Sequence, residues 1–234
     1  MAIILNMDII QQLIKENTDY SSLPEKLYDR LLRDILMGRY GGSGSKLSEN
    51  AVCSDYGVSR TPVRETFRRL ETEGVLEYIP NRGEFIRGFS DEEIDDMIDI
   101  VSSLSVMAVR RAVERITEDE EEELADLFKH MEFYTKKGDV QKMIHINLAF
   151  HRLIRKASHD EPLCRTLDTF GTYLRYLCPP NYFEKKYLTR VLEEHRKIYQ
   201  SLQRKDAGAA VRAMQAFMDN SARRAGRGPS HLIV

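Results

Sequence analysis

The chain has 234 residues, of which 42% are hydrophobic and 31% are charged, and its formal net charge is -2. This length suits one large domain or two smaller ones, and the composition is ordinary for a soluble globular protein. Because the charges nearly balance, the chain is not a uniformly basic coat for nucleic acid, and any DNA-binding surface must be a local patch.

The sequence contains no segment that predicts contact with a membrane. No stretch approaches the roughly 18 consecutive apolar residues that a membrane span needs, and no basic region precedes the apolar run near the start. Cys53, Cys164 and Cys178 are odd in number and widely spaced, which is typical of reduced thiols. We therefore expect a cytoplasmic protein.

The first 88 residues divide into a short extension and a small domain. Residues 1–20 form either a short extra helix or a frayed extension. The domain, residues 21–88, opens on LPEKLYDRLLRDILMGRY, where Leu27, Leu31 and Ile35 recur at i, i+4 and i+8. This spacing predicts a helix with one apolar face, and the GGSGS segment that follows Tyr40 ends it.

Two further helices are predicted with a glycine turn between them. Ser48 is a suitable N-cap for a helix through ENAVCSDY, and Gly57 then breaks it. The next helix begins at Ser59 or Thr61 and carries apolar residues on one face. Helix, glycine-containing turn, helix is the pattern of a helix-turn-helix.

A β-hairpin is predicted directly after the third helix. VLEYI and EFIRG are rich in strand-forming residues, and they flank PNRG, whose proline, asparagine and glycine favour a turn. A hairpin in this position is the wing of a winged helix, so the N-terminal domain is predicted to be a winged helix-turn-helix.

Residues 90–225 are predicted to form an all-helical domain. Ser90 and Thr117 mark helix starts, each followed by acidic residues, and the loops between the helices are short. Short loops favour an antiparallel bundle. The predicted helices span 91–115, 118–136, 139–157, 161–178, 183–204 and 207–225, and 226–234 is a flexible tail. The fold class is therefore mostly α, with a winged helix-turn-helix followed by an antiparallel bundle.

The segment SRTPVRETFRRLETEG, residues 59–74, has the character of a DNA-reading helix. Val63, Phe67 and Leu70 point to one side, so that Arg60, Arg64 and Arg68 fall on the exposed side or at the exposed N-terminal end. Arginine reads guanine in the major groove, and a helix N-terminus with hydroxyl side chains suits phosphate. The alternative is an ordinary solvated basic face, which the flanking glycine turn and hairpin make less favoured.

Residues 23–88 resemble the DNA-binding domain of the GntR family, and the GVSRTPVRE and PNRG segments are the most specific strings. The resemblance implies that DNA contacts come from the start of the third helix and from the wing tip. Asn50 stands where many relatives have Arg, which weakens its expected contribution. The predicted DNA-binding residues are Ser59, Arg60, Thr61, Arg64, Arg68, Arg82, Gly83 and Asn50.

The C-terminal domain resembles the helical effector domain of the FadR-type subfamily, called the FCD domain, through NLAFHRLIRKAS and EEHRKIYQSLQRKDAGAAVRAM. Many members hold a divalent metal with one Asp and three His. The matching positions here are Asn147, His151, His195 and Phe217. One ligand is therefore an amide and another is lost, so Asn147, His151 and His195 could hold Zn or Ni only weakly. The alternative is that the two histidines are core or pocket residues.

The resemblance also implies a pocket for an effector. Many relatives carry an Arg and a Glu near the positions of Ser102 and Ser105, and the Arg often anchors an acidic effector, so a simple carboxylate ligand does not follow from the resemblance. The polar residues expected to line the pocket are Ser102, Ser105, Asn147, His151, Tyr173 and His195.

These features predict a ligand-responsive, sequence-specific transcription regulator rather than an enzyme. The expected partners are a pseudopalindromic double-stranded DNA operator, a second copy of the chain, and a small metabolite, with organic acids among the candidates. The family's usual role implies a repressor of metabolic genes. Two alternatives remain: a constitutive DNA-binding regulator without effector sensing, and a metalloenzyme that uses His151 and His195. No glycine-rich phosphate loop or nucleophile motif supports an enzyme.

Overall fold

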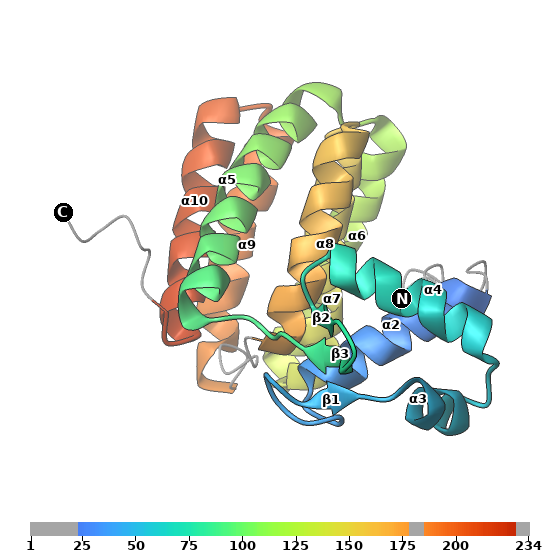
Figure 1. Ribbon diagram of the computed structural model, residues 1–234. Helices are drawn as coiled ribbons and strands as arrows, with labels where there is room; N and C mark the ends of the chain where they lie inside the picture. Colours follow the sequence, from blue (N-terminus) through green and yellow to red (C-terminus); the bar gives the residue numbers. More distant parts are fainter. Residues whose placement is uncertain (1–22, 178–184, 228–234) are drawn as a thin grey trace. The chain divides into compact units, whose positions relative to one another are not determined.

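The computed structural model describes residues 23–177 and 185–227, and the chain forms two compact units that divide between Ile94 and Asp95 (Figure 1). The boundary expected at residues 88–90 precedes the division by less than two helical turns. The predicted extension at 1–20, most of the tail at 226–234, Cys178 and the start of the helix predicted at 183 lie outside the described residues.

The first unit contains the three predicted helices, which are α2 (Leu23–Leu36), α3 (Glu49–Tyr56) and α4 (Arg60–Thr72). The apolar faces predicted from spacing are buried. Ser48 is the N-cap of α3, and Gly57 ends that helix with φ 65°, a left-handed conformation that suits glycine. The core of this unit includes Leu27, Leu31, Leu32, Ile35, Val52, Val63, Phe67 and Leu70.

A three-stranded antiparallel sheet completes the first unit, in the order β1-β3-β2. The predicted hairpin consists of β2 (Leu76–Ile79) and β3 (Gly83–Ile86), and Ile79 pairs with Gly83 beside the turn. Asn81 and Gly83 both have positive φ there. The additional strand β1 (Lys46–Leu47) pairs with β3 and was not expected, because two residues carry no period. The winged helix-turn-helix prediction is confirmed.

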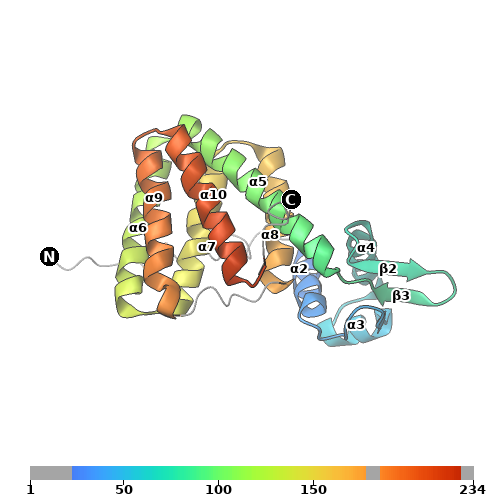
Figure 2. The same cartoon turned by 90° about the vertical axis from the view of Figure 1, so that its left-hand side faces the viewer.

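The second unit is an all-helical bundle, as predicted (Figure 2). Helix α9 contacts both α10 and α6, and α6 also contacts α7. The helices are α5 (Asp91–Arg115), α6 (Glu118–Lys137), α7 (Val140–Ala157), α8 (Glu161–Leu177), α9 (Leu188–Gln203) and α10 (Ala207–Arg224), with the short 3-10 helix η2 (Lys185–Tyr187) before α9.

Side chains at the helix starts explain why the boundaries agree with the sequence. The Thr117 hydroxyl accepts from the Glu120 N–H, and the Glu120 carboxylate accepts from the Thr117 N–H, which is a complete capping box. Asp139 and Asp206 are the N-caps of α7 and α10, and their carboxylates accept hydrogen bonds from the N–H groups of Lys142 and Ala209. Within the described ranges, none of these helices is long and apolar enough to cross a membrane.

Candidate DNA-reading surface and ligand pocket

Helix α4 exposes the residues that the sequence predicted to face DNA. Its inward face buries Val63, Phe67 and Leu70. Ser59, at the N-cap, has an extended backbone and leaves its hydroxyl outside the helix hydrogen bonds. The remaining predicted contacts Arg60, Thr61, Arg64 and Arg68 on α4, Asn50 on α3 and Arg82 in the wing turn are also exposed, whereas Gly83 is half-buried. The structure thus gathers a basic face at the start of α4.

Arg64 is held in place by an acidic residue of the neighbouring helix. Its Nε donates to both carboxylate oxygens of Glu49, at 2.9 and 3.0 Å. This hydrogen bond raises the pKa of Arg64, so the guanidinium stays charged. Because the Arg64 guanidinium binds Glu49 only through Nε, its terminal N–H groups are available for a base edge or a phosphate.

The wing tip carries a second exposed cation. The Arg82 guanidinium lies over the ring of Phe85, 5.1 Å from its centroid, which restricts its motion through a cation–π contact. The turn beneath it is closed by a hydrogen bond from the Arg82 N–H to the Ile79 carbonyl at 3.0 Å.

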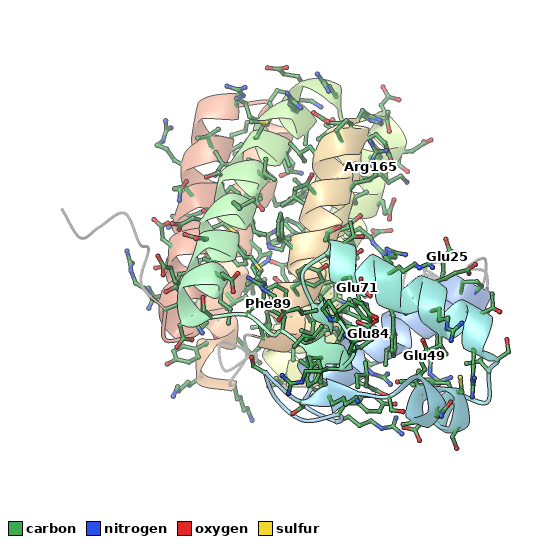
Figure 3. All side chains as sticks on the ribbon, viewed as in Figure 1. Glu25, Glu49, Glu71, Glu84, Phe89 and Arg165 are labelled. Carbon is green, nitrogen blue, oxygen red and sulfur yellow. The ribbon has the colours of Figure 1, made fainter. Side chains whose placement is uncertain are left out.

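Three interacting carboxylates of the first unit are labelled in Figure 3. They belong to Glu49 on α3, Glu71 on α4 and Glu84 on β3. Burial, followed by the charges of Glu71 and Glu49, raises the pKa of Glu84 to about 7. The Glu84 Oε2 atom is buried and has no hydrogen-bond partner among the described residues. Of these three carboxylates, that of Glu49 contacts the basic face of α4, through its ion pair with Arg64.

The second unit contains a pocket of about 200 Å³ between α5, α7, α8 and α10. Apolar side chains form most of its wall. The side chains with polar groups in that wall are Ser105, Asn147, His151, Arg155, Arg175 and Ser221.

The pocket brings together Ser105, Asn147 and His151, which are half of the residues expected there. The other three lie outside its wall. The Ser102 hydroxyl accepts a hydrogen bond from Gln215 Nε2 at 3.3 Å. Tyr173 is 2% exposed and packs in the core, and His195 is completely buried.

His195 lies directly against His151, and the hydrogen bonds determine which nitrogen carries each proton. Nδ1 of His195 is 2.7 Å from the Val191 carbonyl oxygen, which only accepts, so this nitrogen is protonated. Burial lowers the pKa of His195 to about 4, so Nε2 of the neutral ring is an acceptor. The Nε2 atoms of the two rings are 3.1 Å apart, and His151 is therefore the donor.

The donor set around this pair does not fit the metal site that the family resemblance implies. Phe217 offers only a ring, which stacks on His151 with centroids 4.6 Å apart and lies 4.8 Å from His195. Asn147 supplies a neutral amide in place of a carboxylate. No group of three His, Cys, Asp or Glu side chains in the described ranges is arranged to hold a metal ion.

Arg155, Arg175 and Ser221 were not expected in the pocket. Arg155 follows His151 by four residues, and His151 follows Asn147 by four, so one helix face carries all three. The same spacing links Ser221 to Phe217 on α10. This spacing was a usable signal for both residues. Arg175 had no comparable signal, because α8 contains no predicted pocket residue that lines the wall.

Comparison with known families assigns both parts of the chain. Residues 23–86 match the model of bacterial regulatory proteins of the gntR family, and residues 96–220 match the FCD domain. Together these matches cover the winged helix and most of the bundle.

Curated relatives are similar over most of the chain. The Bacillus subtilis transcriptional regulator YdhC is 28% identical over 200 residues, which cover 83% of this chain and 87% of that protein. The Escherichia coli repressor RspR is 24% identical over 190 residues, covering 81% and 83%. The gluconate operon repressor of Bacillus subtilis is 24% identical over 183 residues, covering 76% and 75%.

Solved structures show the same fold. Escherichia coli McbR superposes with a TM-score of 0.70 at 22% identity, covering 88% of this chain and 98% of that one. Lar of Listeria monocytogenes gives a TM-score of 0.63 at 16% identity, covering 89% and 99%. With a winged helix and an FCD domain that both match, the chain belongs to the GntR family of bacterial regulatory proteins and is a transcriptional regulator.

Proposed function

We propose that the protein is a ligand-responsive repressor that binds a pseudopalindromic operator as a homodimer. Its affinity for the operator would change when a small metabolite binds in the bundle pocket. The observation that carries this proposal is the pocket between α5, α7, α8 and α10, which Asn147 and His151 help to line. Relatives named as repressors, RspR and the gluconate operon repressor, support the direction of control. As a regulator of bacterial genes, it would act in the cytoplasm.

Helix α4 would lie in the major groove with its N-terminal residues on the bases. Arg60, Arg64 and Arg68 supply donors for guanine and phosphate, and the N-terminal N–H groups with Ser59 suit a phosphate. Arg82 would reach the backbone or the minor groove from the wing. Two copies related by a two-fold axis would read two half-sites, which explains why the operator should be a pseudopalindrome.

The DNA part of the proposal is tested by selecting genomic fragments with the purified full chain and footprinting them. We expect a protected site with two-fold symmetry and an affinity that falls steeply between about 50 and 200 mM salt, because several arginines displace counterions. A flat salt response or a footprint without symmetry would contradict the proposed mode of binding.

The sensing part is tested by a thermal-shift screen of metabolites on the same protein, since a ligand that binds only the folded state raises the melting temperature. Metabolites that stabilise the protein are then added to the operator complex. A ligand that stabilises the protein and changes operator affinity supports sensing. Operator binding that no stabilising metabolite alters would instead indicate a constitutive regulator.

A further inference from the structure

We propose that Lys46, on strand β1, contacts the phosphate backbone of DNA and acts together with Arg82 of the wing turn. These two side chains, the wing clamp, hold one phosphate on the solvent-facing side of the sheet. The sequence pattern does not single out Lys46, because a strand of two residues carries no period. This inference rests on the proposed function, because it adds a contact to the proposed mode of operator binding.

The register of the sheet places Lys46 on its solvent-facing side. Lys46 is directly opposite Phe85 of β3, and directly opposite residues of an antiparallel pair project from the same face. The next residue of β1, Leu47, is 2% exposed and faces the core. Because successive side chains of a strand alternate between faces, Lys46 points away from the core, and it is exposed.

The Lys46 side chain extends along the sheet towards the wing turn. A side-chain carbon at Gly83 would lie 3.6 Å from Cε of Lys46, so the lysine stem passes beside that glycine. Gly83 directly follows Arg82, whose guanidinium carbon lies 5.1 Å from the centroid of the Phe85 ring. A lysine stem can cover such a surface while its ammonium group stays in water. Two cations from separate segments therefore approach the same part of the wing.

The wing clamp has no partner of opposite charge in the part of the chain that the structure describes. Neither Lys46 nor Arg82 makes a side-chain hydrogen bond or an ion pair there. Glu77 of β2 is also opposite Phe85, but β3 separates β1 from β2, so the backbones at Lys46 and Glu77 are about 9–10 Å apart. Neighbouring like charges repel, and an anion between them relieves the repulsion. An exposed pair of unpaired cations is therefore suited to a phosphate group.

The chemistry of Lys46 indicates a contact with the backbone of DNA instead of a base. An ammonium group is a point charge without the planar fork with which arginine reads guanine. Strand β1 is followed directly by Ser48, the N-cap of α3, so a phosphate held at Lys46 also fixes the start of the helix-turn-helix. Phosphate contacts set the register and orientation of a protein on the duplex without reading sequence. The wing clamp would therefore position the domain, while α4 reads the bases.

The experiment measures the affinity of the full chain for its selected operator and for a scrambled duplex of equal length, over a range of salt concentrations. Lys46→Gln should weaken both complexes by the same factor, about threefold to tenfold, and lower the salt slope by about one, because one phosphate contact fewer is made. Lys46→Arg, which keeps the charge, should retain most of the affinity. An unchanged affinity in Lys46→Gln, or a loss confined to the operator, would overturn the proposal.

Lys136→Gln is the matched control, because Lys136 is an exposed lysine of α6 in the other unit. It should leave both affinities and the salt slope unchanged. Equal losses in Lys46→Gln and Lys136→Gln would show an effect of net charge and contradict a local contact. The melting temperature of each variant is measured on the same samples, and we expect it to match the wild type, because both lysines are exposed.

A double variant tests whether the two cations share one phosphate. Lys46→Gln combined with Arg82→Gln should lose less affinity than the product of the two single losses, because groups that act on one partner are not independent. Losses that simply multiply would contradict the shared clamp. A wild-type chain that binds neither duplex would refute the proposed DNA function itself, whereas a wild type that binds and a Lys46→Gln variant that binds equally well would refute only the wing clamp.

Discussion

Phe217 stacks on the imidazole of His151, with ring centroids 4.6 Å apart and the two planes inclined by 28°. The same imidazole makes a 3.1 Å hydrogen bond to His195, which is itself bonded to the Val191 carbonyl. By the family resemblance, Phe217 stands at the position where many members carry a histidine ligand. In this chain the cluster of His151, His195 and Phe217 is held by ring packing and by a hydrogen bond between the two imidazoles.

The first prediction concerns conversion of this cluster into a metal site. The double variant Asn147→Asp, Phe217→His restores one carboxylate and one imidazole, so it should retain zinc or nickel after loading and dialysis, at about one ion per chain. The wild-type chain, carried through the same dialysis, should retain far less than one ion. Stoichiometric metal in the wild type would show that Asn147 or another residue completes a site.

The second prediction uses the ion pair between Arg64 and Glu49. Arg64→Ala should weaken operator binding roughly tenfold to a hundredfold and lower the salt slope by about one, with an unchanged circular dichroism spectrum, because the side chain is exposed. Glu49→Gln should strengthen binding a few fold, because it removes a negative charge from beside the DNA-facing arginine. Arg165→Ala is the control. If Arg64→Ala binds as tightly as the wild type, Arg64 does not contact the operator.

The third prediction follows from the raised pKa of Glu84, which is about 7 in the folded chain against an ordinary value of 4.5. Between these two pH values the folded state binds the proton more strongly than the unfolded state does. The protonated Glu84 carboxyl therefore makes its full contribution to stability below about pH 4.5, and this contribution is lost as the pH rises through about 7. Glu84→Gln stays neutral at every pH. The free energy of unfolding of Glu84→Gln minus that of the wild type should therefore be larger at about pH 8 than at about pH 5.

Urea unfolding of both proteins at the two pH values provides the measurement. Glu71→Gln is the matched control, since it removes a neighbouring charge and should lower the pKa of Glu84 and weaken the pH dependence. A stability difference between Glu84→Gln and the wild type that does not vary with pH would show that Glu84 titrates normally.

The fourth prediction tests the capping box at the start of α6. Thr117→Ala removes the acceptor for the Glu120 N–H and should cost about 1 kcal/mol of stability, or about 2–4 °C in Tm. Thr117→Ser keeps the hydroxyl and should retain most of the wild-type stability. Equal losses in the two variants would attribute the effect to the threonine methyl group instead of the cap.

Local patterns were sufficient to predict the helices and the face of α4 that is exposed. The spacing of Val63, Phe67 and Leu70 placed the apolar side inward, and the arginines then had to face outward. Thr117 with Glu120, and Gly57, marked helix ends through interactions between residues a few positions apart. These features depend on neighbours in the chain, which is why the sequence alone determined them.

Only the tertiary structure decided which side chains meet in the pocket. Ser102 and Ser105 are three residues apart on α5, yet Ser105 lines the pocket while Ser102 bonds to Gln215 of α10. Arg175 reaches the wall from α8, and strand β1 exists because β3 offers it a partner. Each outcome depends on how a helix is rotated, or a strand is paired, against elements distant in sequence. Packing across the whole core sets that rotation and pairing, and the periodicity of one segment does not encode it.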